Sequence, residues 1–444
     1  MGPVARVGSR IRTEPNATAS PSVSVAGLYR FPCASPRVLP TLRTDPGHSS
    51  RKVASSIDVH ASSHPSAGCA VPLRIQVDAR LLGAGGIGRY LRELTSRWLA
   101  RPDVEALRFL GLPSELEPFL AEHDARGVAE IVPWADGPYS PAAQLRWPAL
   151  SRAAPWIPDV TFLPHYDVPL LRHPEPSVVT VHDLIHFQVR EGFPAWKRAL
   201  GLALLRGALE RARAVVTVSE TSRHAICRLI PAVAGKVHVV PNGVGAAFRP
   251  PTPGEAAHAR GAWGLEGPFM LCVGPDKPHK NLAHAVRVLG QLPAAEGWKL
   301  VLVGPTDGDR DRLVARVGAA ELRARVVPLA HVTDERLRSL YATAEAVLVP
   351  SLLEGFGLPV VEARACGGTV FAGDVPWARE LRASGVTLVR GWSPAVWAGE
   401  VRRSKGDPGS LSPGVWRWET AAERTLQVLQ SAGDVGENHG GAYH

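Results

Sequence analysis

Short apolar runs alternate with amphipathic segments along this chain from residue 73 onward. Each run has the length of a buried strand, and the segments between runs repeat their apolar residues every three or four positions, as helices do. Because neighbouring parallel strands need a crossover between them, strands and helices that alternate in this way form parallel sheets. The pattern therefore predicts a doubly wound α/β fold. The predicted strands lie at residues 73–77, 106–111, 160–165, 178–184, 214–219, 236–244, 269–274, 299–304, 325–329, 346–350 and, as the last strand, 368–372.

A proline-rich segment, 248–254, divides the predicted strands into two series. Its composition is typical of a linker, and 444 residues are too many for one compact core. Residues 1–72 are rich in Ser, Pro, Ala and Arg without any sustained period, which predicts disorder. The predicted parts are a disordered N-terminal extension (1–72), a first domain (73–250), a second domain (255–410), a terminal helix (411–431) and a disordered tail (432–444).

The formal net charge of +9 is concentrated near the N-terminus. Residues 1–72 carry a net charge of +5, which leaves only +4 for the rest of the chain, a weak footprint for nucleic-acid binding. The five cysteines are scattered without metal-ligand spacing, and no run of eighteen apolar residues is present. We therefore expect a cytoplasmic protein with no nucleic-acid partner, while basic segments leave contact with an anionic membrane surface open.

Residues 346–367 combine a strand, a glycine-rich loop and the start of a helix. The apolar run ends at Pro350, Gly355 and Gly357 follow, and Pro359 sits where the first turn of a helix favours proline. At such a junction, the free backbone amides and the positive end of the helix dipole favour an anion or a group of hydroxyls.

Two carboxylates flank this junction. Glu354 stands at the entrance of the loop, and Glu362 lies in the helix that follows. Because carboxylates only accept hydrogen bonds, a pair of them around a ring of amide donors suits a ligand with both hydroxyls and phosphates. An ordinary strand–helix junction with two solvent-facing carboxylates has the same spacing, so the residues alone leave that alternative open.

The stretch resembles the E-x7-E segment of retaining GT-B glycosyltransferases, the large family 4 group that includes sucrose, glycogen and mannosyl transferases. Glu354 and Glu362 have the family spacing, and residues 355–359 read Gly-Phe-Gly-Leu-Pro, as in the family. The resemblance covers about 73–431 and implies a GT-B fold, in which two doubly wound Rossmann-like domains face a central cleft. It implies that Glu354 binds the donor sugar and helps to stabilise positive charge at the anomeric carbon, and that Glu362 binds the ribose. The loop residues expected at the nucleotide sugar are Gly355, Phe356, Gly357 and Leu358.

A basic pair precedes the first helix of the second domain. Lys277 and Lys280 follow the strand 269–274, and Asn281 is placed to cap the helix after it. A lysine at a helix N-terminus opposes the dipole unless an anion binds there, so the pair supports a phosphate site over the simpler alternative of two solvated lysines. The resemblance implies that Lys280, assisted by Lys277, offsets charge on the donor diphosphate.

The predicted strand 178–184 carries His182 at its C-terminal end, which is where α/β folds place ligands. A histidine in that place can equally be a hydrogen-bonded structural residue. In the family this histidine contacts the donor sugar, so the resemblance places His182 among the catalytic residues, with the acceptor hydroxyl approaching nearby. His165 and His186 are lesser candidates for the acceptor side.

Glycines at 83, 85 and 88 precede a helix predicted at 90–99 and fit the GxGxxG dinucleotide fingerprint. This leaves a nicotinamide-dependent oxidoreductase as an alternative. The fingerprint expects an acidic residue at the end of the second strand, whereas Asp103 and Glu105 precede that strand. The resemblance gives another interpretation, in which the amide of Gly86 approaches the donor diphosphate.

The resemblance also implies chemistry without a metal or other cofactor. Asp307 and Asp309 form a DxD pair as in GT-A transferases, but they sit in a predicted polar loop beside arginines. We therefore expect no metal site there. A catalytically inactive GT-B binding protein stays open as a second alternative, because Pro275, Gly368 and Trp392 depart from the common family pattern.

Two short stretches suggest the substrates. Gly-Ile-Gly-Arg-Tyr at 86–90 and Pro-His-Lys-Asn at 278–281 are most similar to bacterial mannosyltransferases of polysaccharide assembly. The resemblance therefore implies GDP-mannose as the first candidate donor, and a glycan or polyprenyl-linked glycan at the inner membrane face as the acceptor.

Overall fold

The computed structural model describes residues 72–434, apart from 126, 138–139, 153–155, 169–173, 175, 189–194, 253, 256–264, 266 and 404–415. All described residues belong to one compact unit, Ala67–His444. The predicted extension 1–72 lies outside the described residues except for Pro72, as does the predicted tail beyond residue 434.

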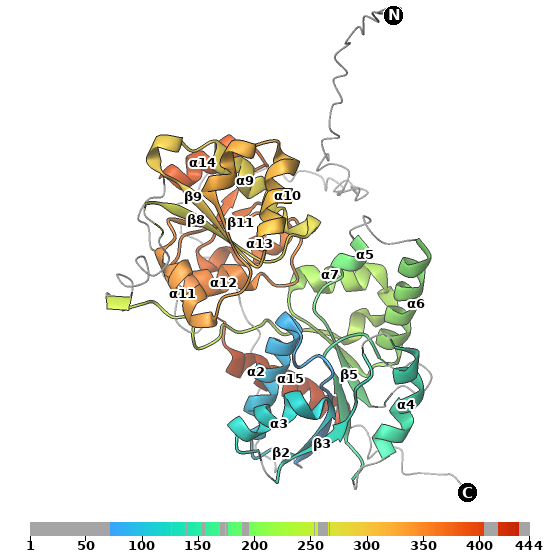
Figure 1. Ribbon diagram of the computed structural model, residues 1–444. Helices are drawn as coiled ribbons and strands as arrows, with labels where there is room; N and C mark the ends of the chain where they lie inside the picture. The colour runs from blue at the N-terminus through green and yellow to red at the C-terminus, as the bar shows by residue number, and fades with distance from the viewer. Residues whose placement is uncertain are drawn as a thin grey trace, which may run out of the picture. The chain divides into compact units, whose positions relative to one another are not determined.

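The first half of the described chain is built on a seven-stranded parallel sheet of order β3-β2-β1-β4-β5-β6-β7 (Figure 1). Helices cover both of its faces: α2 and α3 pack on one side, and α4, α6 and α7 pack on the other. The strands are β1 (Leu73–Asp78), β2 (Val104–Gly111), β3 (Ala129–Pro133), β4 (Val160–Leu163), β5 (Ser177–Val181), β6 (Ala214–Thr217) and β7 (Val237–Val239). The helices are α2 (Gly85–Leu99), α3 (Pro113–Glu122), α4 (Pro141–Arg152), α5 (Ile185–Gln188), α6 (Ala195–Arg211) and α7 (Glu220–Leu229).

The second half is built on a six-stranded parallel sheet of order β10-β9-β8-β11-β12-β13. Again both faces are covered, by α9, α10 and α14 on one side and by α11, α12 and α13 on the other. The strands are β8 (Phe269–Val273), β9 (Lys299–Val303), β10 (Val326–Leu329), β11 (Ala346–Val349), β12 (Val370–Gly373) and β13 (Thr387–Val389). The helices are α9 (Leu282–Gly290), α10 (Asp307–Val317), α11 (Asp334–Thr343), α12 (Leu358–Ala365), α13 (Pro376–Glu380) and α14 (Pro394–Arg403). Two doubly wound Rossmann-like sheets confirm the predicted fold class.

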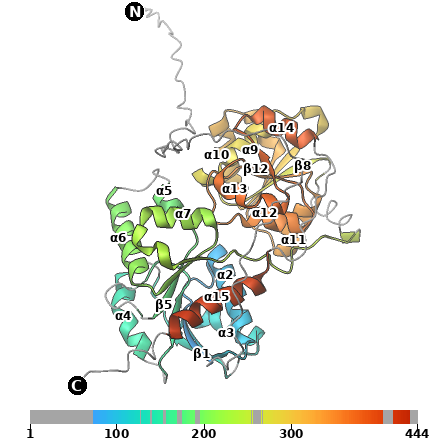
Figure 2. The ribbon, with the colours of Figure 1, turned by 180° about the vertical axis from the view of Figure 1, so that it is seen from behind.

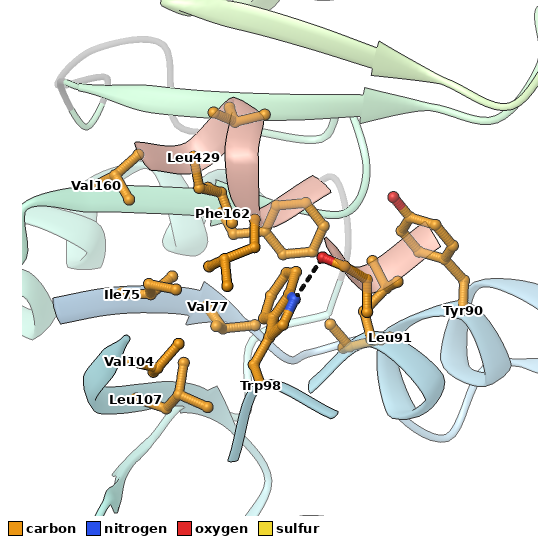
Figure 3. Packing of buried hydrophobic residues seen from close by; sticks show 14 of the residues in the cluster. Ile75, Val77, Tyr90, Leu91, Trp98, Val104, Leu107, Val160, Phe162 and Leu429 are labelled. Carbon is orange, nitrogen blue, oxygen red and sulfur yellow. Dashed lines mark hydrogen bonds between the residues drawn. The ribbon is translucent and has the colours of Figure 1, made fainter. Parts of the chain in front are cut away.

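The last helix, α15 (Trp418–Gly433), packs on the first sheet although it follows the second in sequence (Figure 2). Its apolar face lies against α2 and joins the core of the first half, where the indole Nε1 of Trp98 donates to the carbonyl of Ala422 at 3.0 Å (Figure 3). Leu429 on α15 and Phe162 on β4 belong to the same fully buried cluster. The helix extends to Gly433, so the predicted disordered tail begins too early.

Other differences from the predicted elements have local causes. Two edge strands, β3 and β13, were not predicted, so 368–372 is not the last strand. Helix α2 begins at Gly85 rather than at residue 90. Asp307 and Asp309 lie in the first turn of α10 rather than in a loop, because Asp309 forms a capping box with Thr306 and fixes the start of the helix there.

Candidate active site

The strand order of each sheet reverses at one point, and most of the predicted site residues lie after the strands beside it, whereas His182 follows β5. In the second sheet the reversal lies between β8 and β11. The loop after β8 carries Lys277 and Lys280, and the loop after β11 carries Glu354 and Gly355. Loops at such a reversal diverge to opposite faces of the sheet and leave a crevice between them, which is where α/β folds bind ligands.

A glycine in the left-handed region lets the chain turn from β11 into α12. Gly357 has a φ of +95°, and an added Cβ would lie 2.9 Å from the side chains of Trp377 and Leu381. Helix α12 begins at Leu358, whose backbone amide has no carbonyl partner one turn earlier in the helix, whereas Pro359 has no amide hydrogen and Val360 donates to the carbonyl of Gly357 at 2.9 Å. Phe356 is buried with its ring 5.3 Å from that of Trp416, so only its backbone is available to a ligand.

Lys280 and Glu354 form an ion pair between the loops that follow β8 and β11. The Nζ of Lys280 lies 2.7 Å from Oε1 and 3.0 Å from Oε2 of Glu354. The side chains are only 15% and 9% exposed, so water screens this pair weakly. Gly274, with a φ of +131°, makes room for the lysine stem, because an added Cβ would lie 3.3 Å from its Cε. The structure therefore brings together a cation and a carboxylate that are 74 residues apart.

The second lysine and the predicted cap behave differently. Lys277 is exposed, and no ion pair involves it within the described part of the chain. Asn281 stands at the N-cap position of α9 but has left-handed backbone angles (φ +52°) and makes no side-chain cap bond. The predicted capping role of Asn281 is therefore wrong, since this conformation turns its side chain away from the free amides of the first turn.

His182 meets the second half through its backbone rather than through its imidazole. An ideal Cβ on Gly355 would lie 2.5 Å from the carbonyl oxygen of His182, and Ser222 Oγ donates to the carbonyls of both residues at 3.3 and 3.4 Å. The imidazole Nε2 donates to the carbonyl of Pro164 at 3.0 Å, and the ring stands edge-on to Tyr90 at 4.7 Å. Burial lowers the pKa of His182, an effect that neighbouring Asp183 opposes, so the ring is neutral near pH 7.

Glu362 is buried and held by one residue from each half. The Nη1 of Arg89, on α2, lies 2.7 Å from Oε1, and the hydroxyl of Tyr341 donates to Oε2 at 3.1 Å. The Nη2 of Arg89 also contacts both oxygens of Asp334 at 2.5 Å. Burial raises the pKa of the Glu362 carboxyl, while Arg89 and Tyr341 oppose that shift.

Gly86 lies one helical turn before Arg89, in the first turn of α2. It is exposed, and an added Cβ would meet no atom within 4 Å. Its neighbour Gly85 has a φ of +42°, and Glu115 on α3 accepts a hydrogen bond from the amide of Gly83 at 2.8 Å. The loop that leads into α2 is therefore tethered at Gly83 and open at Gly86.

His165, one of the two lesser histidine candidates, interacts electrostatically with His182 and with His186, the other candidate. Burial lowers the pKa of His165 to about 3, so its imidazole is neutral, and its Nδ1 accepts from the amide of Asp167 at 3.0 Å. His186 is exposed on the short helix α5.

Several residues of the site were not predicted from the sequence. Arg89 is the only one with a usable signal, because it stands in the Gly-Ile-Gly-Arg-Tyr stretch after Gly86. Tyr341 and Ser222 have no local pattern that marks them. Glu380 also joins the two halves, because its carboxylate accepts from the amides of Glu220 and Thr221 at 2.9 and 2.5 Å, at the start of α7.

Two features are absent from the described residues. No group of three or more His, Cys, Asp or Glu side chains that could hold a metal ion occurs among them. None of their helices is both long enough and apolar enough to cross a membrane.

Comparison with protein families divides the chain in the same place as the two sheets. Residues 84–248 match the model of Glycosyltransferase Family 4, and residues 255–407 match that of Glycosyl transferases group 1. The two matches together cover most of the chain from α2 to α14, which confirms the resemblance predicted from the Glu354 to Glu362 segment.

Curated relatives point the same way. The O-antigen chain mannosyltransferase RfbU of Salmonella typhimurium is 28% identical over 250 residues, which is 56% of this chain and 65% of the relative. The O-antigen chain mannosyltransferase B of Escherichia coli is 30% identical over 205 residues, 45% of this chain and 54% of the relative. The matched segments thus span about half to two thirds of the relatives' own length.

Solved structures share the fold. HepE of Anabaena in complex with UDP and glucose has a TM-score of 0.62 at 18% identity and covers 81% of this chain and 100% of its own. WaaG, a glycosyltransferase involved in lipopolysaccharide biosynthesis, has a TM-score of 0.58 at 16% identity and covers 82% and 99%. At these identities the likeness shows that the two sheets form a GT-B fold.

Proposed function

Because this chain belongs to the glycosyltransferases that join a family 4 domain to a group 1 domain, we propose that it moves a sugar from a nucleotide sugar to a glycan or lipid-linked glycan, with retention of anomeric configuration. The first candidate donor is GDP-mannose, which the names of two relatives as O-antigen chain mannosyltransferases support. The observation that carries the proposal is the ion pair of Lys280 and Glu354 at the strand reversal of the second sheet.

A charged ligand can replace each partner of this ion pair. Before the donor binds, Lys280 compensates Glu354, since a buried carboxylate without a partner is costly. When the donor binds, its diphosphate takes the ammonium of Lys280, and Glu354 turns to the hydroxyls of the sugar. As the bond between sugar and phosphate breaks, Lys280 offsets the charge on the leaving diphosphate, and Glu354 stabilises positive charge at the anomeric carbon.

The remaining predicted residues position the donor around this pair. Backbone amides from Gly355 to Leu358 at the start of α12 donate hydrogen bonds to sugar or phosphate oxygens, and the dipole of the helix favours the negative charge. The amide of Gly86 approaches the diphosphate from the first half, Lys277 adds a second cation, and Glu362 binds the ribose hydroxyls.

We assign the reaction to front-face substitution. The acceptor hydroxyl approaches from the first half near His182 and attacks the anomeric carbon on the side from which the diphosphate leaves. The oxygen of the leaving phosphate takes the proton of that hydroxyl, so no carboxylate has to form a covalent bond to the sugar. Because Lys280 supplies the positive charge that the leaving group needs, the reaction proceeds without a metal ion or other cofactor.

Thermal unfolding of the full chain with a panel of nucleotide sugars tests the proposal. A ligand that binds only the folded state raises the unfolding midpoint by mass action. We expect one nucleoside diphosphate sugar, GDP-mannose first, to raise it equally with and without EDTA, and Lys280→Met to abolish the shift. Lys277→Met, which removes an exposed lysine of the same loop, should weaken the shift less. Analysis of the product by NMR then reports whether the anomeric configuration is retained.

The same panel separates the two alternatives. A shift produced by NAD or NADP would instead support the oxidoreductase suggested by the glycines at 83, 85 and 88. A donor that stabilises the protein but is never consumed with any glycan acceptor would support an inactive binding protein.

We further propose peripheral contact with an anionic membrane at its cytoplasmic face, through α6. Trp196 and Leu200 are four residues apart on this helix and are 64% and 53% exposed, whereas Leu205 and Leu209 are buried. Five residues of helix separate Leu200 from Leu205, which turns the two leucines to different sides. Arg206 and Arg211 on the same helix are exposed and suit an acidic surface.

Sedimentation with vesicles tests this contact. Trp196→Ser with Leu200→Ser should reduce binding to vesicles that contain phosphatidylglycerol, whereas Leu229→Ser, a change at an exposed leucine of α7, should not. Equal binding of the two variants would remove α6 as the contact.

A further inference from the structure

Arg89 joins the two halves at the carboxylate that we assign to the ribose. It extends from the first turns of α2 and reaches Glu362 on α12 at 2.7 Å and Asp334 on α11 at 2.5 Å. The guanidinium is 27% exposed, whereas Glu362 is only 5% exposed. Arg89 is thus the solvent-side neighbour of a buried acid, and it comes from the opposite half of the molecule.

The hydrogen-bonding capacity of Glu362 is half used by the protein. An ionised carboxylate has about four lone-pair positions, two on each oxygen. Arg89 occupies one position on Oε1, and the hydroxyl of Tyr341 occupies one on Oε2. One acceptor position therefore remains on each oxygen, which is the pattern that two vicinal hydroxyls require.

We propose that Arg89 is a positioning residue for donor binding, which holds Glu362 as an oriented anion for the two adjacent hydroxyls of a ribose. The inference rests on the proposed function, because it assigns the ligand of Glu362 to a nucleotide. It adds that the ribose site of the second half is completed by a side chain of the first half.

The charges around Glu362 explain why the guanidinium matters. Burial raises the pKa of the carboxyl and so favours its neutral form, which donates one hydrogen bond in place of accepting it. Arg89 is the cation that lowers this pKa, whereas Asp334 on α11 raises it. Tyr341 and Cys366 also face the carboxyl, but the pKa of the tyrosine is well above its usual value and that of the thiol is about 12, so neither titrates between pH 6 and 9.

Arg97 offers a matched control on the same helix. It is 26% exposed, as against 27% for Arg89, and it forms ion pairs with Glu93 and Glu419 instead of with the second half. Arg89→Gln removes the charge near Glu362, Arg89→Lys keeps it, and Arg97→Gln removes a charge of equal exposure elsewhere on α2.

The experiment first measures the affinity of the full chain for GDP, UDP and ADP between pH 6 and 9. The nucleotide that binds is then compared with its 2′-deoxy counterpart. At pH 7 we expect Arg89→Gln to weaken binding of the ribonucleotide about tenfold, which is the loss of one charge-assisted contact. We expect Arg89→Lys to restore most of the affinity and Arg97→Gln to change it less than twofold. Affinity should begin to fall at a higher pH in Arg89→Gln than in the wild type, because Glu362 then takes up its proton more readily. The variant should also discriminate less against the 2′-deoxy nucleotide.

Several results would overturn the assignment. If Arg89→Gln binds the nucleotide with wild-type affinity, Arg89 is only a structural contact between the halves. The same conclusion follows if affinity falls by the same factor at every pH and for both the ribonucleotide and its 2′-deoxy counterpart. If Arg89→Gln does not fold, Arg89→Lys decides, because a loss of nucleotide affinity in this variant, which keeps the positive charge beside Glu362, would also count against the assignment. If the wild type binds no nucleotide, the proposed function itself is contradicted. This result is distinct from failure of the role assigned to Arg89, in which the wild type still binds a nucleotide.

Discussion

The carbonyl oxygen of His182 lies against the Cα of Gly355, so the end of β5 in the first half meets the loop of the second half at a residue without a side chain. An ideal Cβ at Gly355 would lie 2.5 Å from that oxygen, a distance that real Cβ atoms do not tolerate. Ser222 Oγ donates to the carbonyls of both residues and closes the contact. Glu354, the residue before the glycine, is thereby placed beside the end of the strand that carries His182.

A methyl group at this contact should cost activity far more than stability. Gly355→Ala forces the loop and the strand end apart by several tenths of an ångström, and a misplacement on the order of 1 Å at a reacting group costs about a hundredfold in rate. We expect a fall in kcat of about this size, with the unfolding midpoint within a few degrees of the wild type. Gly399→Ala is the control, because an added Cβ on that helical glycine meets nothing within 4 Å. Full activity of Gly355→Ala would show that the halves need not meet at this point during the reaction.

The ion pair of Lys280 and Glu354 predicts opposite responses of stability and activity. Lys280→Met or Glu354→Gln alone leaves one buried charge without its partner, which typically costs about 3–5 kcal/mol. The double variant has no unpaired charge, so its free energy of unfolding should return toward that of the wild type. Sugar transfer should stay lost in all three variants, because each lacks a group that the reaction needs. Chemical denaturation together with donor turnover measures both, and recovered turnover in the double variant would contradict the assigned roles.

The fold could be predicted from the sequence because its strands are buried on both faces and read as continuous apolar runs. The two strands that were missed lie at sheet edges and lack this signal. In β3 the residues from Ala129 to Val132 are only half-buried, and β13 has three residues, of which Thr387 is exposed. Their register comes from pairing with β2 and β12, which a local pattern does not contain.

The site was predictable only where one stretch of sequence carries it. Glu354 and Glu362 share a segment, so their spacing could be read directly. The contact of Arg89 with Glu362 joins residues 273 positions apart, and no periodicity encodes it. Asn281 failed as a cap because the 3₁₀ turn Pro278–Lys280 before α9 ends in a left-handed residue, which the identity of the side chain does not reveal.

His284 predicts a loss of stability on acidification. Its imidazole is buried on α9 and lies nearly perpendicular to the rings of Trp392 and Trp397, and its Nε2 has no hydrogen-bond partner in the described part of the chain. Burial, assisted by Arg287, lowers its pKa from 6.5 to about 4. The unfolded chain therefore binds the proton first as pH falls, so the stability that the neutral ring contributes is present above pH 6.5 and is lost toward pH 4.

Replacement of this histidine should flatten that part of the pH profile. Relative to His284→Leu, we expect the wild type to lose on the order of 3 kcal/mol of unfolding free energy between pH 6.5 and 4. Urea unfolding of both proteins across this range gives the difference directly. Parallel profiles would mean that the ring acquires a proton inside the fold without penalty.

Removal of apolar contacts from α15 should unfold the first half selectively. Leu429 is fully buried in the cluster that α15 forms with α2 and the first sheet, and truncation of such a leucine to alanine costs about 2–5 kcal/mol. We expect Leu429→Ala to lower the unfolding midpoint of the first half while the second half keeps its native near-ultraviolet circular dichroism, because its cores contain no residue of α15. Gln427→Ala, a change at an exposed position of the same helix, should leave both unchanged. If both halves melted together with the same loss in Leu429→Ala, the halves would unfold as one cooperative unit, and α15 would stabilise the whole chain rather than the sheet on which it packs.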